Sequence, residues 1–113
     1  MEKDLIQAQK ELINKYWPQI LDENKKLEST NMMIHAIIKE LSELSDGYSC
    51  FPWSKPKNIN KKYMLEEITD IFHFVLELYI IWGVTTFEEV FDLYLKKRSK
   101  NINRGKIHLH FSN

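Results

Sequence analysis

Apolar residues recur along most of this chain every three or four positions, which is the spacing of amphipathic helices. One such pattern covers residues 5–16 and ends before Pro18, which cannot continue a helix. A second pattern runs over residues 33–44. The polar residues at 29–31 are predicted to cap its start, and Gly47 is predicted to close its end. The first half of the chain therefore predicts two helices.

The second half of the chain predicts two further helices. Residues 62–82 are apolar around much of a helix circumference, which indicates a central position, and Gly83 ends the pattern. A threonine pair at 85–86 can cap the next helix, whose apolar residues lead into a basic run at 96–106. Residues 47–61 contain two prolines and no helical period, so we expect a loop there.

Length and composition predict one all-α domain over residues 1–113, with 105–113 as a short C-terminal tail. The chain has 113 residues, of which 43% are hydrophobic and 28% charged, which is the balance of a globular protein. A domain of this size leaves much apolar surface uncovered. We therefore expect four antiparallel helices that are completed by oligomerisation, as a homodimer or a higher homo-oligomer.

Charge and cysteine usage exclude several classes of protein. The 16 basic and 16 acidic side chains cancel, so the whole-chain charge does not indicate binding to a nucleic acid polymer. The single cysteine, Cys50, cannot form an intramolecular disulfide, and the N-terminus lacks the apolar core of a signal peptide. The longest apolar stretch, residues 71–84, is too short to cross a membrane. We therefore expect a cytoplasmic protein without a membrane partner.

Two pairs of acidic residues are the candidates for a functional site. Glu40 and Glu43 lie in the second predicted helix, and Glu67 and Asp70 lie in the third. Residues three apart share a helix face, so each pair forms a patch of two carboxylates. If the two helices pack antiparallel, the four acids face one another, and their repulsion calls for a cation. Oxygen ligands favour Mg²⁺, with Mn²⁺ as an alternative.

A basic set follows in the fourth helix. Lys97, Asn101 and Arg104 are spaced four and three apart, again on one helix face. Lys and Arg bind phosphate oxygens through charge and hydrogen bonds. A metal site together with such a face suits a polyphosphate that is attacked by metal-activated water, with a carboxylate outside the metal shell as general base.

Two other interpretations stay open at this point. Acidic pairs at this spacing are common on solvated helix faces, and then the chain is a non-catalytic helical module. Alternatively, Asp70-x-x-His73 resembles half of the ligand set of a di-iron or di-manganese carboxylate bundle. His73 could be a metal ligand, but a residue that orients a ligand is the more common role for it.

The order of these motifs resembles that of the MazG-like superfamily of all-α nucleotide pyrophosphohydrolases. The residues in and around these motifs most resemble those of its dimeric, phage-type all-α dUTPase branch. The resemblance rests on ELSEL at 40–44, CFPWSK at 50–55, LEEITDIFHF at 65–74, and the downstream set Lys97, Asn101 and Arg104. It covers residues 33–104, which is most of the chain.

The resemblance implies a four-helix MazG-like module that hydrolyses a nucleoside triphosphate, with dUTP as the leading substrate, to the monophosphate and pyrophosphate. Activity on dCTP or a broader set of nucleotides is the alternative. The resemblance implies that the four acids Glu40, Glu43, Glu67 and Asp70 hold Mg²⁺, or that Glu40 instead orients the water. The implied substrate contacts are Lys55, Lys97 and Arg104 to phosphates, Asn101 to the sugar or a phosphate, Trp53 and Phe51 near the nucleotide, and Gln9 and Asn14 near the base.

Overall fold

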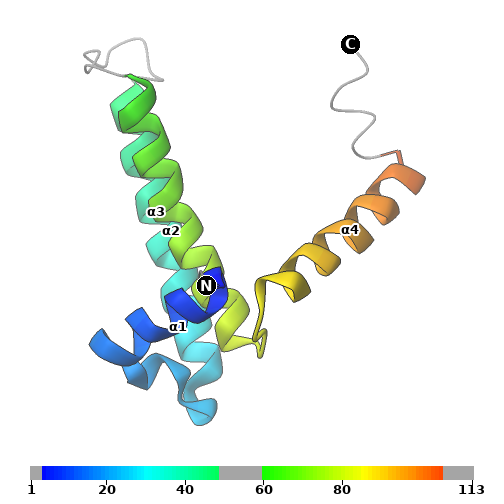
Figure 1. Cartoon of the computed structure of the whole chain (residues 1–113). Helices are drawn as coiled ribbons and strands as arrows, with labels where there is room; N and C mark the ends of the chain where they lie inside the picture. The colour runs from blue at the N-terminus through cyan, green and yellow to red at the C-terminus, as the bar shows by residue number, and fades with distance from the viewer. Residues whose placement is uncertain (1–3, 49–59, 106–113) are drawn as a thin grey trace.

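The structure, a computed structural model, describes residues 4–48 and 60–105, and all of its regular elements are helical (Figure 1). They are α1 Leu5–Tyr16, the short 3-10 turns η1 Pro18–Leu21 and η2 Glu23–Lys25, α2 Lys26–Tyr48, α3 Lys61–Ile81 and α4 Phe87–Asn103. These ranges contain no strand, so the predicted all-α class with four helices is confirmed. No helix in these ranges is both long enough and apolar enough to cross a membrane.

An antiparallel hairpin of α2 and α3 forms the long axis of the molecule, and α1 lies across one end of it (Figure 1). The buried core gathers at that end. It comprises Ile6, Ile13 and Ile20 from the N-terminal segment, Met33 from α2, and Leu76, Ile80, Ile81, Val84 and Val90 from the second half of the chain. The acidic pairs lie towards the other end of the hairpin, away from this core.

The predicted start and end of α2 were wrong. The helix begins at Lys26, where it continues directly from η2, so residues 29–31 lie within it rather than before it. Thr30 Oγ1 donates a hydrogen bond to the Lys26 carbonyl at 2.7 Å, and Ser29 is buried. These side chains therefore serve packing and local bonding instead of capping. At the other end, the helix continues through Gly47 to Tyr48, because glycine permits a helix end without imposing one.

Caps fix the starts of the other helices. The Asn60 carboxamide accepts the Tyr63 N–H at 2.8 Å, and the Thr86 hydroxyl accepts the Glu89 N–H at 3.3 Å, as predicted for the threonine pair. Asp4 caps α1 by accepting the Ile6 N–H at 2.8 Å. Both Asp4 carboxylate oxygens also lie 2.9 Å from the Phe87 nitrogen. One carboxylate thus ties the first turns of α1 and α4 together.

Beyond its first turn, α4 leaves the rest of the molecule. Gly83 follows α3 with φ of +93°, a left-handed conformation that suits glycine and turns the chain. From there α4 projects at an angle from the hairpin, so that the two form a V (Figure 1). Its large side chains are exposed, for example Phe91 at 53% and Tyr94 at 60%. The four predicted helices are present, but within one chain the fourth does not close a bundle.

Candidate metal and phosphate site

Three of the four predicted acids come together across the hairpin. Glu40 of α2 and the pair Glu67 and Asp70 of α3 each offer a carboxylate oxygen, and these oxygens lie within 4.8 Å of one another. Glu40 and Glu67 are half-buried and Asp70 is exposed. The antiparallel packing of α2 on α3 creates this group, because each helix alone supplies only one flank of it.

The electrostatics of the group show mutual repulsion. Partial burial raises the pKa of Glu40 above its usual value, and the neighbouring charges of Glu43, Asp70 and Glu67 raise it further. Glu43 also shares a hydrogen bond with Glu40, which again raises that pKa. Glu43 itself is exposed and does not belong to the group of three. A cation among these oxygens would remove the repulsion.

The residues of the group fit a hard divalent cation. All donors are carboxylate oxygens, which Mg²⁺ and Mn²⁺ prefer over the nitrogen and sulfur donors favoured by zinc. Mg²⁺ binds oxygen at about 2.0–2.1 Å and usually keeps several waters. The oxygens of the group lie within 4.8 Å of one another, which brings them near a common ion. Rotation of the half-buried Glu40 and Glu67 and of the exposed Asp70 can adjust their positions to the ion.

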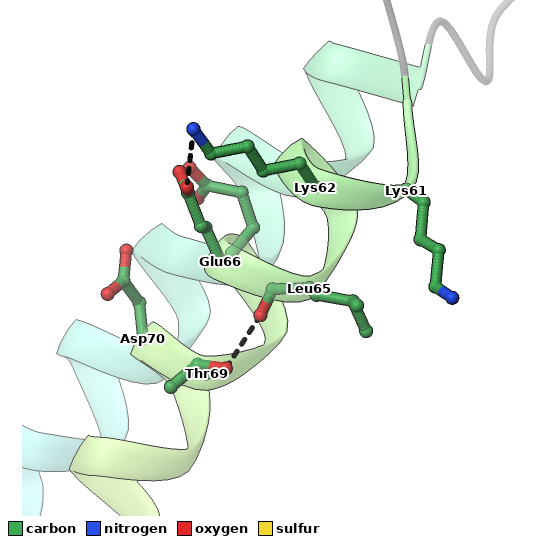
Figure 2. Close-up of a pocket in the computed structure, with 7 residues that line it drawn as sticks. Lys61, Lys62, Leu65, Glu66, Thr69 and Asp70 are labelled. Atoms are coloured by element: carbon green, nitrogen blue, oxygen red, sulfur yellow. Dashed lines mark hydrogen bonds and ion pairs between the residues drawn. The ribbon is translucent and has the colours of Figure 1, made fainter.

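An open cavity of about 850 Å³ adjoins the group along the first turns of α3. Figure 2 shows its lining, in which Asp70 points away to one side of α3 while Thr69 and Leu65 face another. The lining residues are Lys61, Lys62, Leu65, Glu66, Glu67, Thr69 and Asp70. Cavities of this size accommodate small-molecule ligands. The depression thus offers both carboxylates and lysines to a ligand beside the acidic group.

The predicted phosphate-binding set lies elsewhere in the chain. Lys97, Asn101 and Arg104 are on and just after α4, which projects away from the hairpin that carries the acids (Figure 1). Lys97 instead lines a separate cavity of about 480 Å³ that includes Tyr79 of α3. The Asn101 side-chain oxygen is buried but accepts no hydrogen bond from the described part of the chain. Within the described residues, Lys97, Asn101 and Arg104 therefore do not lie with the acids of the hairpin.

The remaining predicted contacts have varied surroundings. Gln9 is only 5% exposed and donates a hydrogen bond from Nε2 to Glu77 at 3.0 Å, whereas Asn14 is exposed on α1. His73 is exposed and stands outside the group of three acids, so within the described residues the di-metal Glu/His pattern is not assembled. The predicted contacts Phe51, Trp53 and Lys55 lie outside the described residues.

Sequence reasoning missed Glu77. Burial raises its pKa above the usual 4.5, while its hydrogen bond with Gln9 and the charge of His73 act in the opposite direction. Glu77 follows Asp70 by seven residues and so continues the acidic face of α3 towards α1. This spacing of seven residues is the sequence feature from which Glu77 could have been predicted. The partner Gln9 could not be inferred, because it comes from a helix distant in sequence.

Comparison with known families gave one match. A family model described as dUTPase, which represents the all-α dimeric dUTPases, matches residues 2–103. The match spans all four helices and every acidic residue discussed above. Searches of curated proteins and of solved structures gave no match.

Proposed function

The chain belongs to the all-α dimeric dUTPase family, and on that premise we propose that it hydrolyses dUTP to dUMP and pyrophosphate with Mg²⁺ as its cofactor. The observation that carries the proposal is the meeting of Glu40, Glu67 and Asp70 across the hairpin. Acids brought so close repel one another, and a bound cation relieves that repulsion. A nucleoside triphosphate is the substrate that such a cation would hold in this family.

Glu40, Glu67 and Asp70 would hold the metal, and Glu43 completes the acidic patch. When bound, Mg²⁺ supplies charge neutralisation for the phosphate oxygens and lowers the pKa of a nearby water. Glu43 is available to accept the proton of the attacking water, because it stands beside Glu40 but outside the group of three. Glu40 is the alternative acceptor, since it stands beside Glu43 in the same acidic patch.

The pyrophosphate leaving group needs positive charge as it departs. Lys97 and Arg104 are our candidates for this role, with Lys55 from the segment between α2 and α3, and Asn101 is our candidate for the sugar or a phosphate. Trp53, beside Lys55 in sequence, is a candidate for contact with the nucleotide. Gln9 and Asn14 remain our candidates for contact with the base. For Gln9 this requires a change, because its amide is buried against Glu77.

The base specificity is part of the proposal. dUTP is favoured by the family match over residues 2–103. Hydrolysis of dCTP or of several nucleotides is the alternative, because Gln9 and Asn14 are five residues apart and point to different surroundings. A homodimer is the expected assembly, since the family is dimeric and α4 leaves large apolar side chains exposed.

Pyrophosphate release from purified protein with Mg²⁺ tests the proposal, with dUTP, dCTP, dTTP and the purine nucleotides as parallel substrates. We expect turnover of dUTP, and loss of at least about 100-fold in Glu67→Gln because a metal ligand is removed. The matched control is Glu28→Gln, which removes an exposed acid three turns before Glu40 on α2 and should leave turnover unchanged. Absence of turnover on every nucleotide would refute the enzymatic function.

A further inference from the structure

A polar pair interrupts the apolar packing between α1 and α3. Gln9 lies between Ile6 and Ile13 on the buried face of α1 and is itself only 5% exposed. Its Nε2 donates a hydrogen bond to the half-buried Glu77 of α3 at 3.0 Å. Burying an amide and a carboxylate costs more free energy than burying two apolar side chains of similar size. The pair therefore offers the fold no advantage, which points to a role in function.

Glu77 lies on the same face of α3 as the acids of the candidate site. It follows Asp70 by seven residues, which is two helical turns or about 10 Å along the axis. Burial raises the pKa of Glu77 and the charge of His73 acts against it, so His73 lies near Glu77 on the way to Asp70. A nucleotide whose phosphates bind at the acids places its base a comparable distance away. The polar pair thus lies where the base of such a substrate is expected.

The carboxylate of Glu77 determines which way round the Gln9 amide lies. An ionised carboxylate only accepts hydrogen bonds, so it faces the NH₂ group of the amide and not its oxygen. Turning the amide over would place Oε1 of Gln9 against the carboxylate, and the two oxygens would repel each other. With Nε2 held in this way, Oε1 and the remaining N–H are an acceptor and a donor in fixed order for another ligand.

Uracil and cytosine require opposite orientations of such an amide. Uracil presents the O4 acceptor beside the N3–H donor, whereas cytosine presents the N4 amino donor beside the N3 acceptor. An amide that donates its N–H to O4 and accepts N3–H is therefore complementary to uracil. The same amide turned over is complementary to cytosine. A carboxylate that prevents this turn can thus discriminate between the two bases.

We propose that Glu77 is a positioning residue that holds the Gln9 amide in the orientation complementary to uracil, so that dUTP is preferred over dCTP. This inference rests on the proposed function and deepens it, because it names the residue that sets the base specificity. Since Gln9 is 5% exposed, a base reaches its amide only when a covering side chain moves. The bond to Glu77 keeps the amide in one orientation during that movement.

Glu77→Gln tests the inference, because it keeps the size of the side chain but removes the restriction on Gln9. The new amide can accept a hydrogen bond from Nε2 of Gln9 or donate one to its Oε1, so Gln9 can lie either way round. We expect the ratio of kcat/KM for dUTP to kcat/KM for dCTP to fall by at least about tenfold. Thymine has the same N3–H and O4 as uracil, so the ratio of dUTP to dTTP should stay unchanged.

Gln9→Ala shows whether Glu77 acts through the amide. In the Gln9→Ala background, Glu77→Gln should not change the dUTP-to-dCTP ratio further, and Glu28→Gln on the exposed surface of α2 should keep the wild-type ratio. Circular dichroism of each variant checks that the helices are intact.

Three results would overturn the inference: an unchanged dUTP-to-dCTP ratio in Glu77→Gln, an equal fall of that ratio in both backgrounds, or a parallel fall of the dUTP-to-dTTP ratio. A wild-type protein without dUTP turnover would instead refute the proposed function itself.

Discussion

Replacing Asp70 with asparagine should change the stability of the protein in opposite directions with and without Mg²⁺. The carboxylate oxygens of Asp70, Glu40 and Glu67 lie within 4.8 Å of one another. In a water-like dielectric, a pair of unit charges at this distance repels by about 1 kcal/mol. Asp70 takes part in two such pairs, and salt near 0.15 M roughly halves the sum to about 1 kcal/mol.

The metal-free variant should therefore be more stable than the wild type by about 1 kcal/mol, which is about 4 °C in Tm for a domain of this size. With Mg²⁺ the order should reverse. A ligand at 100 times its Kd stabilises the folded protein by about 2.7 kcal/mol, and the wild type should show this gain while the variant loses most of it. Dye-monitored thermal unfolding in EDTA and in MgCl₂ measures both effects.

Glu28→Gln serves as the control for this experiment. Glu28 is exposed in the first turn of α2, so its removal should cost a few tenths of a kcal/mol through the helix dipole, equally with and without Mg²⁺. The reasoning is refuted if Asp70→Asn lowers Tm in EDTA, or if MgCl₂ raises the Tm of the variant as much as that of the wild type. Either result would mean that these carboxylates neither repel appreciably nor bind the metal.

Three further predictions concern stability. Asp4→Ala should destabilise the protein by about 1–2 kcal/mol in urea unfolding, because it removes the cap of α1 and the bond to Phe87 that ties down α4, whereas Asp4→Asn should retain most of the cap. Leu76→Ala should cost about 2–5 kcal/mol, since this side chain is 2% exposed in the core; a loss below 1 kcal/mol would contradict its central position. Glu77→Gln should stabilise the protein relative to the wild type by an amount that increases with pH. Burial raises the pKa of Glu77, so the folded wild type loses stability when this group ionises, while the variant still accepts the Gln9 bond. In urea unfolding, the free energy of unfolding of the variant should exceed that of the wild type only slightly below pH 4.5 and by a growing amount above pH 4.5. A difference that does not change with pH would contradict this cause.

Local patterns in the sequence predicted the elements of this fold because helices are specified by neighbouring residues. The spacing of apolar residues gave four helices, and Gly83 and Thr86 marked the end of α3 and the start of α4 as the structure has them. The start of α2 was missed because residues 29–31 have good capping chemistry but lie inside a longer helix. Capping propensity is a weak local preference, and the packing of η1 and η2 against α2 outweighs it.

The acids of the candidate site followed from the sequence, but their partners did not. The spacing of three within each acidic pair defines a helix face, and the short connection between α2 and α3 favours an antiparallel hairpin, so the meeting of Glu40 with Glu67 and Asp70 was predictable. Neither the bond between Gln9 and Glu77 nor the link from Asp4 to Phe87 was visible, because each joins residues far apart in the chain.

The direction of α4 is the feature that only the tertiary structure decided. The sequence placed Lys97, Asn101 and Arg104 on one helix face and suggested that this face meets the acids. It contains no local signal for the angle at which a helix leaves a turn, since that angle depends on Gly83 and on the anchoring of Phe87 by Asp4. The resulting V directs α4, and with it Lys97, Asn101 and Arg104, away from the hairpin that carries the acids (Figure 1), so the described part of the chain does not bring the two groups together.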